Sequence, residues 1–412
     1  MARLQNTFEF VGNLNFGEKP VKSFEYDSGW NKKQLSVSIN ESQSNGAFLS
    51  LDAYFHPAKP NKVVTFSKSL FGEKGGKIEL AWADRFNQSN IDSVPDYKKV
   101  VIDLTEDVEA KEKYQKLRGE IYNLETKEEP TAEDRQKLGE LYKSVRETVP
   151  LCHEFLHSLD AIEFIEQHSA ELKGKKFRAK GSIDMRKWKD KFYTNYTMQS
   201  LELVSEDEPS KLSVRADLYY TKDAIDKSGF KSEQTILFDT YILAYDSGHK
   251  ADKLFPFRTI FNGKKYDFTN PKHQSHMDIV EKFMTVKKKG VYHLPFDIKI
   301  VRGAEEKEFS EEQLTDEQKM MIDLGFNTAK DFQTGGKVFG DRIEENRLAI
   351  PLLKQFGGEN FSKGSLESNY NEDDLVYIPA ESNYTPKTES KVEPTDTTSS
   401  SPFDFDENDL PF

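Results

Sequence analysis

The sequence predicts an α+β protein with one or two small β-barrels, helical insertions and a disordered acidic C-terminal tail. Apolar and polar residues alternate in short runs within residues 1–104 and 173–305, which is typical of half-buried strands. Between these regions apolar residues recur every three or four positions, as they do in amphipathic helices. After residue 378 large apolar side chains become rare, so this segment cannot bury enough surface to order itself.

The N-terminal region, residues 1–104, is expected to form short strands separated by Gly, Asn and Pro. The strands are predicted over residues 7–16, 34–39, 47–55, 62–66 and 77–82. Five short strands favour a small barrel, and Gly12 is compatible with the bend that a barrel strand needs at a corner.

Residues 105–172 are expected to form a helical hairpin and a linking helix. Tyr114 begins an apolar stripe at helical spacing, Pro130-Thr131 interrupts it, and Leu138 resumes it. The Glu and Lys residues between the apolar positions are interpreted as a solvated face. A further helix is predicted from about Leu151 to Leu172.

Residues 173–305 are expected to form a second β-rich domain. Strands are predicted over residues 176–185, 192–204, 211–220, 234–245 and 290–301, with a helix over residues 273–286. A long hairpin, further strands, a helix and a closing strand are the elements of an oligonucleotide-binding (OB) barrel. Residues 306–378 are predicted to be mainly helical or irregular, with a helix over residues 315–324, and residues 379–412 to be a disordered linker and docking tip.

The chain ends in an acidic segment closed by Leu-Pro-Phe. Pro411 restricts the backbone, so Phe412 is presented to an apolar pocket while the acidic residues attract a basic partner. We expect this tip to dock on partner proteins through Asp404, Phe405, Asp406, Glu407, Asp409, Leu410, Pro411 and Phe412. The alternative is an acidic terminus that only solvates the protein.

This tail resembles that of the bacterial and bacteriophage single-stranded DNA-binding proteins, whose disordered linker ends in an acidic peptide closing with Pro-Phe. The resemblance covers about the last ten residues and the linker before them, so it does not assign the fold upstream. It implies single-strand binding during DNA replication and recombination, and recruitment of replication, recombination and repair enzymes through the tip.

The densest interleaving of basic and aromatic residues lies between Lys173 and Gln199. Nine cations and two carboxylates give this segment a charge of +7, although the whole chain carries −13. Single strands are held by cations that contact phosphates and by rings that stack on bases with little sequence preference. The predicted binding residues are Lys173, Lys175, Lys176, Arg178, Lys180, Arg186, Lys187, Trp188, Lys189, Lys191, Phe192, Tyr193 and Tyr196. The alternative is a strand pair whose rings pack inward and whose lysines are solvated.

A second, weaker cluster lies in the first β-rich region and is predicted to contribute to the same binding. It consists of Trp30, Lys32 and Lys33, with Tyr54 and Phe55 nearby in the sequence. Tyr54 and Phe55 must point to opposite faces of a regular strand, so they cannot both serve one surface.

The segment His153-Glu-Phe-Leu-His157 matches the H-E-x-x-H pattern of zinc metalloproteases. On a helix the two imidazoles would share one face and bind zinc, with Glu154 as general base. Asp160 and Glu163 occupy the positions of the glycine and third histidine of the metzincin extension. No Walker loop, dinucleotide fingerprint or nucleophile elbow is visible, so an enzyme ranks below a binding protein.

The composition, 36% hydrophobic and 31% charged over 412 residues, fits a soluble globular protein. The single cysteine, Cys152, excludes an intramolecular disulfide framework and suits a reducing compartment. No apolar run reaches the length of a membrane span, and the N-terminus lacks a signal-peptide core. We therefore expect the cytoplasm of a bacterial cell or phage-infected host, with no membrane partner.

We predict a protein that binds single-stranded DNA with little sequence preference, is not an enzyme and uses no cofactor or metal. One alternative is a replication or recombination accessory factor that mainly binds proteins, and the other is the zinc metalloprotease. The sequence leaves open the choice between DNA and RNA, the size of the binding site, the partner enzymes and assembly into a homo-oligomer.

Overall fold

The structure is a computed structural model that describes residues 6–59, 61–307, 316–324, 338–353 and 366–379. It is a mixed α+β structure in which strands predominate, as the sequence predicts. Fifteen of the described strands belong to one extended sheet, while β4 (Lys62–Phe66) and β5 (Lys77–Ala81) form a separate two-stranded sheet.

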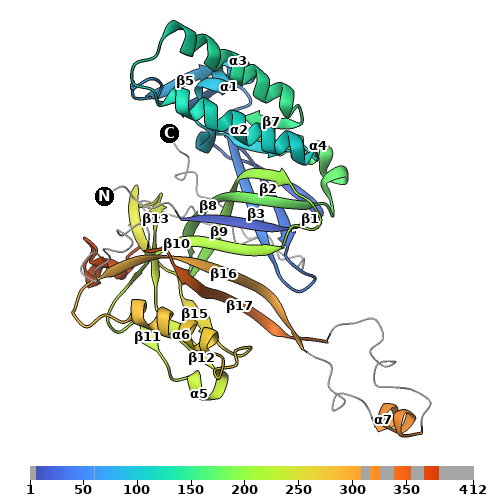
Figure 1. Ribbon diagram of the computed structural model, residues 1–412, viewed down its shortest axis with the longest axis vertical. Coiled ribbons are helices and arrows are strands. Elements are labelled where there is room, and N and C mark those ends of the chain that lie inside the picture. Colours follow the sequence, from blue (N-terminus) through green and yellow to red (C-terminus); the bar gives the residue numbers. More distant parts are fainter. Residues whose placement is uncertain (1–5, 60, 308–315, 325–337, 354–365, 380–412) are drawn as a thin grey trace.

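The other strands and the helices follow one another along the chain as shown in Figure 1. The strands are β1 (Thr7–Glu25), β2 (Asn31–Asn40), β3 (Gly46–Phe55), β6 (Val100–Asp103), β7 (Cys152–Phe155), β8 (Lys176–Trp188), β9 (Lys191–Leu203), β10 (Lys211–Tyr220), β11 (Ile225–Asp226), β12 (Thr235–Phe238), β13 (Tyr241–Asp246), β14 (Ala251–Pro256), β15 (Thr259–Asn262), β16 (Tyr292–Lys307) and β17 (Val338–Pro351). The α-helices are α1 (Gln88–Ser93), α2 (Val108–Glu125), α3 (Ala132–Thr148), α4 (Ser158–Leu172), α5 (Phe230–Glu233), α6 (Pro271–Met284) and α7 (Asp316–Asp323). Among the described helices, none combines the length and the apolar character needed to cross a membrane.

Five strands pair in a closed circuit. β1 pairs with β2, β2 with β3, β3 with β9, β9 with β8, and β8 again with β1. All these pairs are antiparallel except β3 with β9, which run parallel at Leu49 and Tyr196. Inward side chains such as Phe10, Leu49 and Phe177 belong to the main hydrophobic core, and α4 packs on β1, β2 and β3.

β1 changes its partner near Gly12. Residues 7–13 pair with β8, and residues 13–25 pair with β2. A Cβ atom on Gly12 would lie 2.2 Å from the backbone oxygen of Asn40, a separation that real side chains do not reach. The close approach of the two backbones at this changeover therefore requires glycine.

β10 connects the circuit to the rest of the sheet, because it pairs with β1 on one side and with β16 on the other. β16 then pairs with β17, β17 runs parallel to β15, and β15 pairs with β12. α6 packs beside β17, and the Tyr220 hydroxyl donates a hydrogen bond of 2.9 Å to the Phe283 carbonyl of α6. The sheet thus combines strands from both β-rich regions that the sequence predicts.

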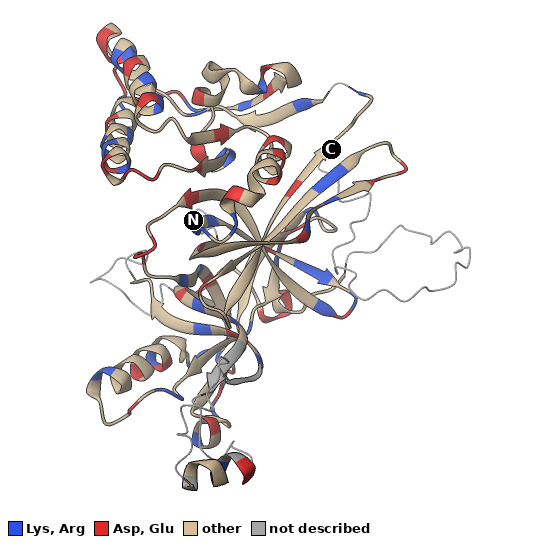
Figure 2. Cartoon of the chain, turned by 90° about the vertical axis from the view of Figure 1, so that its right-hand side faces the viewer, with Lys and Arg blue, Asp and Glu red and all other residues tan. Residues whose placement is uncertain are grey.

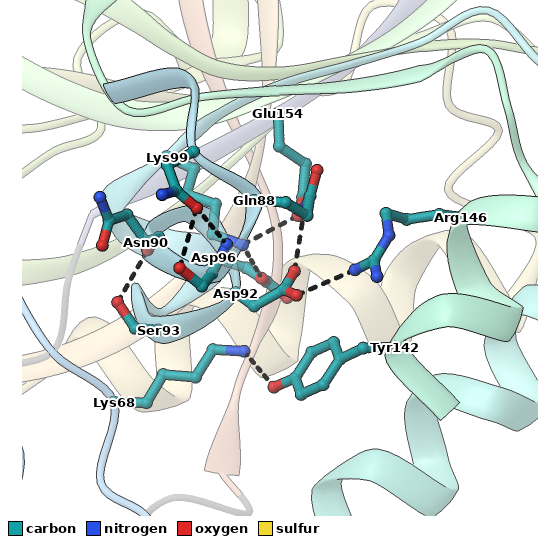
Figure 3. Close-up of polar contacts among 12 residues, drawn as sticks. Lys68, Gln88, Asn90, Asp92, Ser93, Asp96, Lys99, Tyr142, Arg146 and Glu154 are labelled. Atoms are coloured by element: carbon teal, nitrogen blue, oxygen red, sulfur yellow. Dashed lines mark hydrogen bonds and ion pairs between the residues drawn. The ribbon is translucent and has the colours of Figure 1, made fainter. Parts of the chain in front are cut away.

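Residues 56–157 form an insertion between β3 and α4. Its helices α2 and α3 make the predicted antiparallel hairpin, which lies at the top of Figure 1. Thr131 begins α3 through a capping box with Asp134, in agreement with the break predicted at Pro130-Thr131. Ion pairs attach the hairpin to the rest of the insertion, among them Arg146 to Asp92 at 2.9 Å (Figure 3).

Three predicted elements are wrong in detail. The helix predicted over residues 151–172 begins at Ser158, because residues 152–155 pair with β6 as strand β7. The strand predicted over residues 234–245 is interrupted at Asp239-Thr240, where the Thr240 hydroxyl bonds to the Phe257 carbonyl. Strand β17 lies in a segment predicted to be helical or irregular. Its residues show no clear alternation of apolar and polar side chains, so the strand is evident only from its pairing with β16.

Candidate nucleic-acid interface

The β8–β9 hairpin carries most of the residues that the sequence analysis selects. Its register pairs Arg186 with Tyr193 and Trp188 with Lys191. Opposite residues of an antiparallel pair share a face, as do residues two apart on one strand, so these four side chains lie on one face. Met185, on the other face, is buried in the main core. We call Arg186, Trp188, Lys191 and Tyr193 the hairpin face.

Cations and rings alternate over the hairpin face. The ring centroids of Trp188 and Tyr193 lie 6.5 Å apart in an edge-on arrangement. Lys189, in the turn, places its amine 4.3 Å from the centre of the Trp188 ring. Trp188 is 41% exposed, and Lys189 and Lys191 are exposed too. Since Figure 2 shows basic and acidic residues interspersed over the molecule, the positive character of this tip is local.

Three residues predicted to bind nucleic acid pack on the opposite side of the hairpin. The centroids of the Phe192 and Tyr377 rings lie 5.5 Å apart, and the Lys187 amine lies 5.3 Å from the centre of the Tyr377 ring. Tyr196 is 5% exposed and packs edge-on against Phe10 at 4.9 Å. The prediction of nucleic-acid contact is therefore wrong for Tyr196, and strand alternation directs Phe192 and Lys187 away from the hairpin face.

Four cations at the base of the hairpin are paired within the protein. Lys176 is buried and donates to the Glu206 carbonyl at 2.9 Å, while Arg178 contacts the Glu202 carboxylate at 2.7 Å. Lys173 is exposed at the end of α4. The remaining ion pairs join Lys175 to Glu106 at 3.5 Å and Lys180 to Glu9 at 3.6 Å. The segment charge of +7 thus overstates the charge available to phosphates, which resides mainly at the tip.

The second predicted cluster does not form one surface. Lys32 is 1% exposed and lies 3.1 Å from the Asp52 carboxylate, so it joins β2 to β3 and cannot reach nucleic acid. Lys33 pairs with Glu163 of α4 at 2.8 Å. Trp30 is half-buried just before β2. The prediction is therefore wrong for Lys32. Lysine is rarely buried, so the sequence alone does not indicate that this side chain lies inside the protein.

Phe48, which is not among the binding residues predicted from the sequence, extends the hairpin face onto β3. Its side chain is 71% exposed. Because Leu49 lies beside Tyr196 in the parallel register, Phe48 lies next to Asn195 of β9. The Ser50 hydroxyl also donates to Asn195 at 2.8 Å on this surface. The alternation of residues 47–55 could have indicated Phe48, because it opposes the inward Leu49.

The H-E-x-x-H segment lacks the helical geometry of a zinc protease. His153 and Glu154 lie on β7, and Glu154 pairs with Lys99 at 2.9 Å. His157 precedes α4 and its Nδ1 accepts the Leu159 amide hydrogen at 3.1 Å, while burial lowers the pKa of the imidazole. Within the described residues no three His, Cys, Asp or Glu side chains are grouped to hold a metal. The His153 ring packs against that of Phe164, with 4.6 Å between the ring centroids, and His157 caps α4.

Comparisons with known proteins give a distant structural likeness. No protein-family model matches the chain, and no curated protein matches it. Among solved structures, a deletion mutant of the single-stranded DNA-binding protein from Thermus aquaticus aligns with a TM-score of 0.27 at 7% identity, over 73% of this chain and 89% of that chain. The wild-type protein aligns with a TM-score of 0.25 at 7% identity, over 73% of this chain and 85% of its own.

Proposed function

We propose that this protein binds single-stranded DNA with little sequence preference through the hairpin face and Phe48. The observation that carries the proposal is the alternation of Arg186 and Lys191 with Trp188 and Tyr193 on one face of the hairpin. Trp188 and Lys191 are exposed there, and Arg186 and Tyr193 are half-buried. The rings stack on bases and the cations neutralise phosphates. Since every base offers a flat face, stacking of this kind selects single strands without selecting a sequence.

The order of the strands supports the proposal. The circuit β1-β2-β3-β9-β8, with β3 parallel to β9 and α4 between the third and fourth strands, has the order of an OB barrel. In that fold, strands two and three and the loops after strands one and four contact oligonucleotides. The β8–β9 turn corresponds to the second of these loops, and Phe48 lies on the third strand.

We infer that a second, open barrel of the same type follows. In chain order its strands are β10, β12, β15, β16 and β17, with α6 between the third and the fourth. The pairings of β10 with β16, β16 with β17, β17 with β15 and β15 with β12 follow the order of the first circuit. The two barrels share the sheet through the pairing of β1 with β10.

A titration of the full chain with fluorescent oligo(dT) tests the proposal. We expect tight binding of the single strand and weak binding of a duplex of the same length, because paired bases do not expose their faces. If Arg186, Lys189 and Lys191 each neutralise one phosphate, the logarithm of the binding constant should fall with the logarithm of salt with a slope of about −2.

Charge reversal distinguishes the hairpin tip from a general effect of net charge. The double variant Lys189→Glu, Lys191→Glu should weaken binding and flatten the salt dependence. The control is Lys137→Glu with Lys143→Glu on α3, which changes the net charge equally at exposed positions. Equal losses of affinity in the two double variants, or equal affinity of the wild type for single and double strands, would refute the proposal.

We propose further that the protein acts in DNA replication or recombination by binding and not by catalysis. The accessory-factor alternative predicts partner proteins without oligonucleotide affinity. The same titration therefore separates the two functions, because only the single-strand binder responds to oligo(dT).

The predicted docking tip, residues 404–412, lies outside the residues that the structure describes, and we propose from its sequence that it recruits partner proteins. Deleting these residues should abolish capture of replication or repair proteins, while single-strand affinity stays equal or rises modestly because an acidic tail competes with DNA for cations. Phe412→Ala should lose the partners but retain this competition, since the carboxylates remain. Capture of the same partners by all three proteins would contradict the recruiting role.

A further inference from the structure

The β4–β5 hairpin of the insertion has one buried and one exposed face. Val63 packs into a small apolar cluster on the inner side. Lys62, Val64 and Phe66 alternate with the buried positions and are exposed. Phe66 is 44% exposed and lies opposite Lys77 in the hairpin register. An accessible ring and an accessible amine therefore lie side by side on the outer face.

Two residues from a separate segment join this face. The 3-10 helix Asp96–Lys98 carries Tyr97, which is 65% exposed. The Lys98 amine lies 5.2 Å from the centre of the Phe66 ring and 5.8 Å from the centre of the Tyr97 ring. One flexible cation thus lies near two exposed rings from different parts of the chain. We call Phe66, Lys77, Tyr97 and Lys98 the insertion platform.

Lys99, the residue after Lys98, holds the insertion platform in place. The Lys99 side chain is 1% exposed, and its amine lies 2.9 Å from the Glu154 carboxylate and 3.4 Å from that of Asp96 (Figure 3). Because the buried Lys99 is fixed by these two carboxylates, the adjoining Tyr97 and Lys98 are presented outward before any ligand arrives. Such preorganisation lowers the entropy that binding costs.

We propose that the insertion platform is a second contact for single-stranded DNA, which rests on the proposed function and extends the bound strand beyond the hairpin face. Phe66 and Tyr97 stack on bases, and Lys77 and Lys98 meet phosphates. When a base displaces Lys98 from a ring, loss of the cation–π contact lowers the affinity by a factor of about 2 to 5. Stacking raises the affinity by a factor of about 5 to 150 per base. The exchange therefore favours the bound strand.

The cations decide between nucleic acid and an apolar protein partner. An apolar partner would remove water from the Lys77 and Lys98 amines without offering an acceptor, which opposes binding. Phosphates supply that acceptor. Glu79, the carboxylate that β5 places on this outer face, already pairs with Lys62 at 3.1 Å. The charge of the platform is thus complementary to a polyanion.

An oligonucleotide length series on the full chain tests the second contact. The variant Phe66→Ala, Tyr97→Ala, Lys98→Ala is compared with the wild type on oligo(dT) of about 10 and about 40 nucleotides, which lie within and well beyond one OB site. We expect unchanged affinity for the short strand and a loss of about 10- to 100-fold for the long strand, as expected for one or two lost stacking contacts. Tyr122→Ala on α2, 65% exposed in the wild type, is the matched control and should bind both strands normally.

Each outcome supports or overturns the second contact. Photocrosslinking of long oligonucleotides carrying 5-iododeoxyuridine should label peptides that contain Phe66 or Tyr97, which reports contact without any substitution. Equal long-strand affinity of the triple variant and the wild type, with no such crosslink, overturns the platform and leaves the hairpin face standing. Failure of the wild type to bind either length refutes the proposed function itself, and the platform with it.

Discussion

The neighbouring residues Phe192 and Tyr193 should respond oppositely to replacement by alanine, because β9 directs them to opposite faces. Tyr193 lies opposite Arg186 on the hairpin face. Tyr193→Ala removes a stacking ring, so single-strand binding should weaken by about 1–3 kcal/mol, or about 5- to 150-fold. The free energy of unfolding should change by less than about 1 kcal/mol, since the ring is not part of the core.

Phe192→Ala should have the reverse effect. Its ring packs at 5.5 Å from Tyr377 and 6.1 Å from Phe255. A fully buried Phe→Ala change costs about 3–5 kcal/mol, so for this half-buried ring we expect a loss of about 2 kcal/mol in the free energy of unfolding. Its affinity for oligo(dT), measured where the variant is fully folded, should stay near that of the wild type.

Two measurements on the same samples check this pair. Fluorescence anisotropy with labelled oligo(dT) at low salt gives the affinity, and urea unfolding followed by circular dichroism gives the stability. Trp188→Ala combined with Tyr193→Ala should lose less than the sum of the single losses, because the two rings interact at 6.5 Å. If Tyr193→Ala binds as tightly as the wild type, or folded Phe192→Ala loses as much affinity, the assignment of the two faces is wrong.

Four further predictions concern the supporting structure. Asp52→Ala strands the buried Lys32 amine and should lower the free energy of unfolding by about 3–5 kcal/mol in urea melts, whereas Lys32→Met should leave oligo(dT) affinity unchanged. Gly12→Ala should cost at least about 1–3 kcal/mol in the same melts, because the new methyl group would meet a backbone oxygen at 2.2 Å. Burial lowers the pKa of His157 below its ordinary 6.5, so the neutral imidazole contributes its full stability above pH 6.5. This contribution is lost as the pH falls below 6.5 and through the lowered pKa. His157→Asn should therefore make the free energy of unfolding fall less between melts at pH 7 and pH 5. Burial, with nearby carboxylates, raises the pKa of the Cys152 thiol to about 12, so iodoacetamide at pH 8 should modify the folded protein far more slowly than the urea-unfolded protein.

Local patterns in the sequence were enough to place several elements. The three- and four-residue spacing around Tyr114 and Leu138, broken at Pro130-Thr131, predicted the helical hairpin, because helix period and capping act within a few residues. Alternation predicted the β8–β9 hairpin for the same reason, and composition located the basic and aromatic segment, residues 173–199, that contains it.

Tertiary contacts decided what these elements do. Alternation separates Phe192 from Tyr193 but does not state which one faces solvent; packing against Tyr377, distant in the chain, decides it. Contacts across strands likewise pair the buried Lys32 with Asp52, and pair Arg178 at the base of the hairpin with Glu202.

The sequence by itself therefore determined the local period of most segments and the basic and aromatic character of residues 173–199, since both depend on neighbouring residues. Only the tertiary structure decided that β1 pairs with β8 across about 170 residues, that Ser158 begins α4, and that Phe48 adjoins the hairpin face. The physical reason is that a strand is completed by hydrogen bonds to a partner far along the chain, and neither the partner nor the exposed face is encoded in the period of the strand alone.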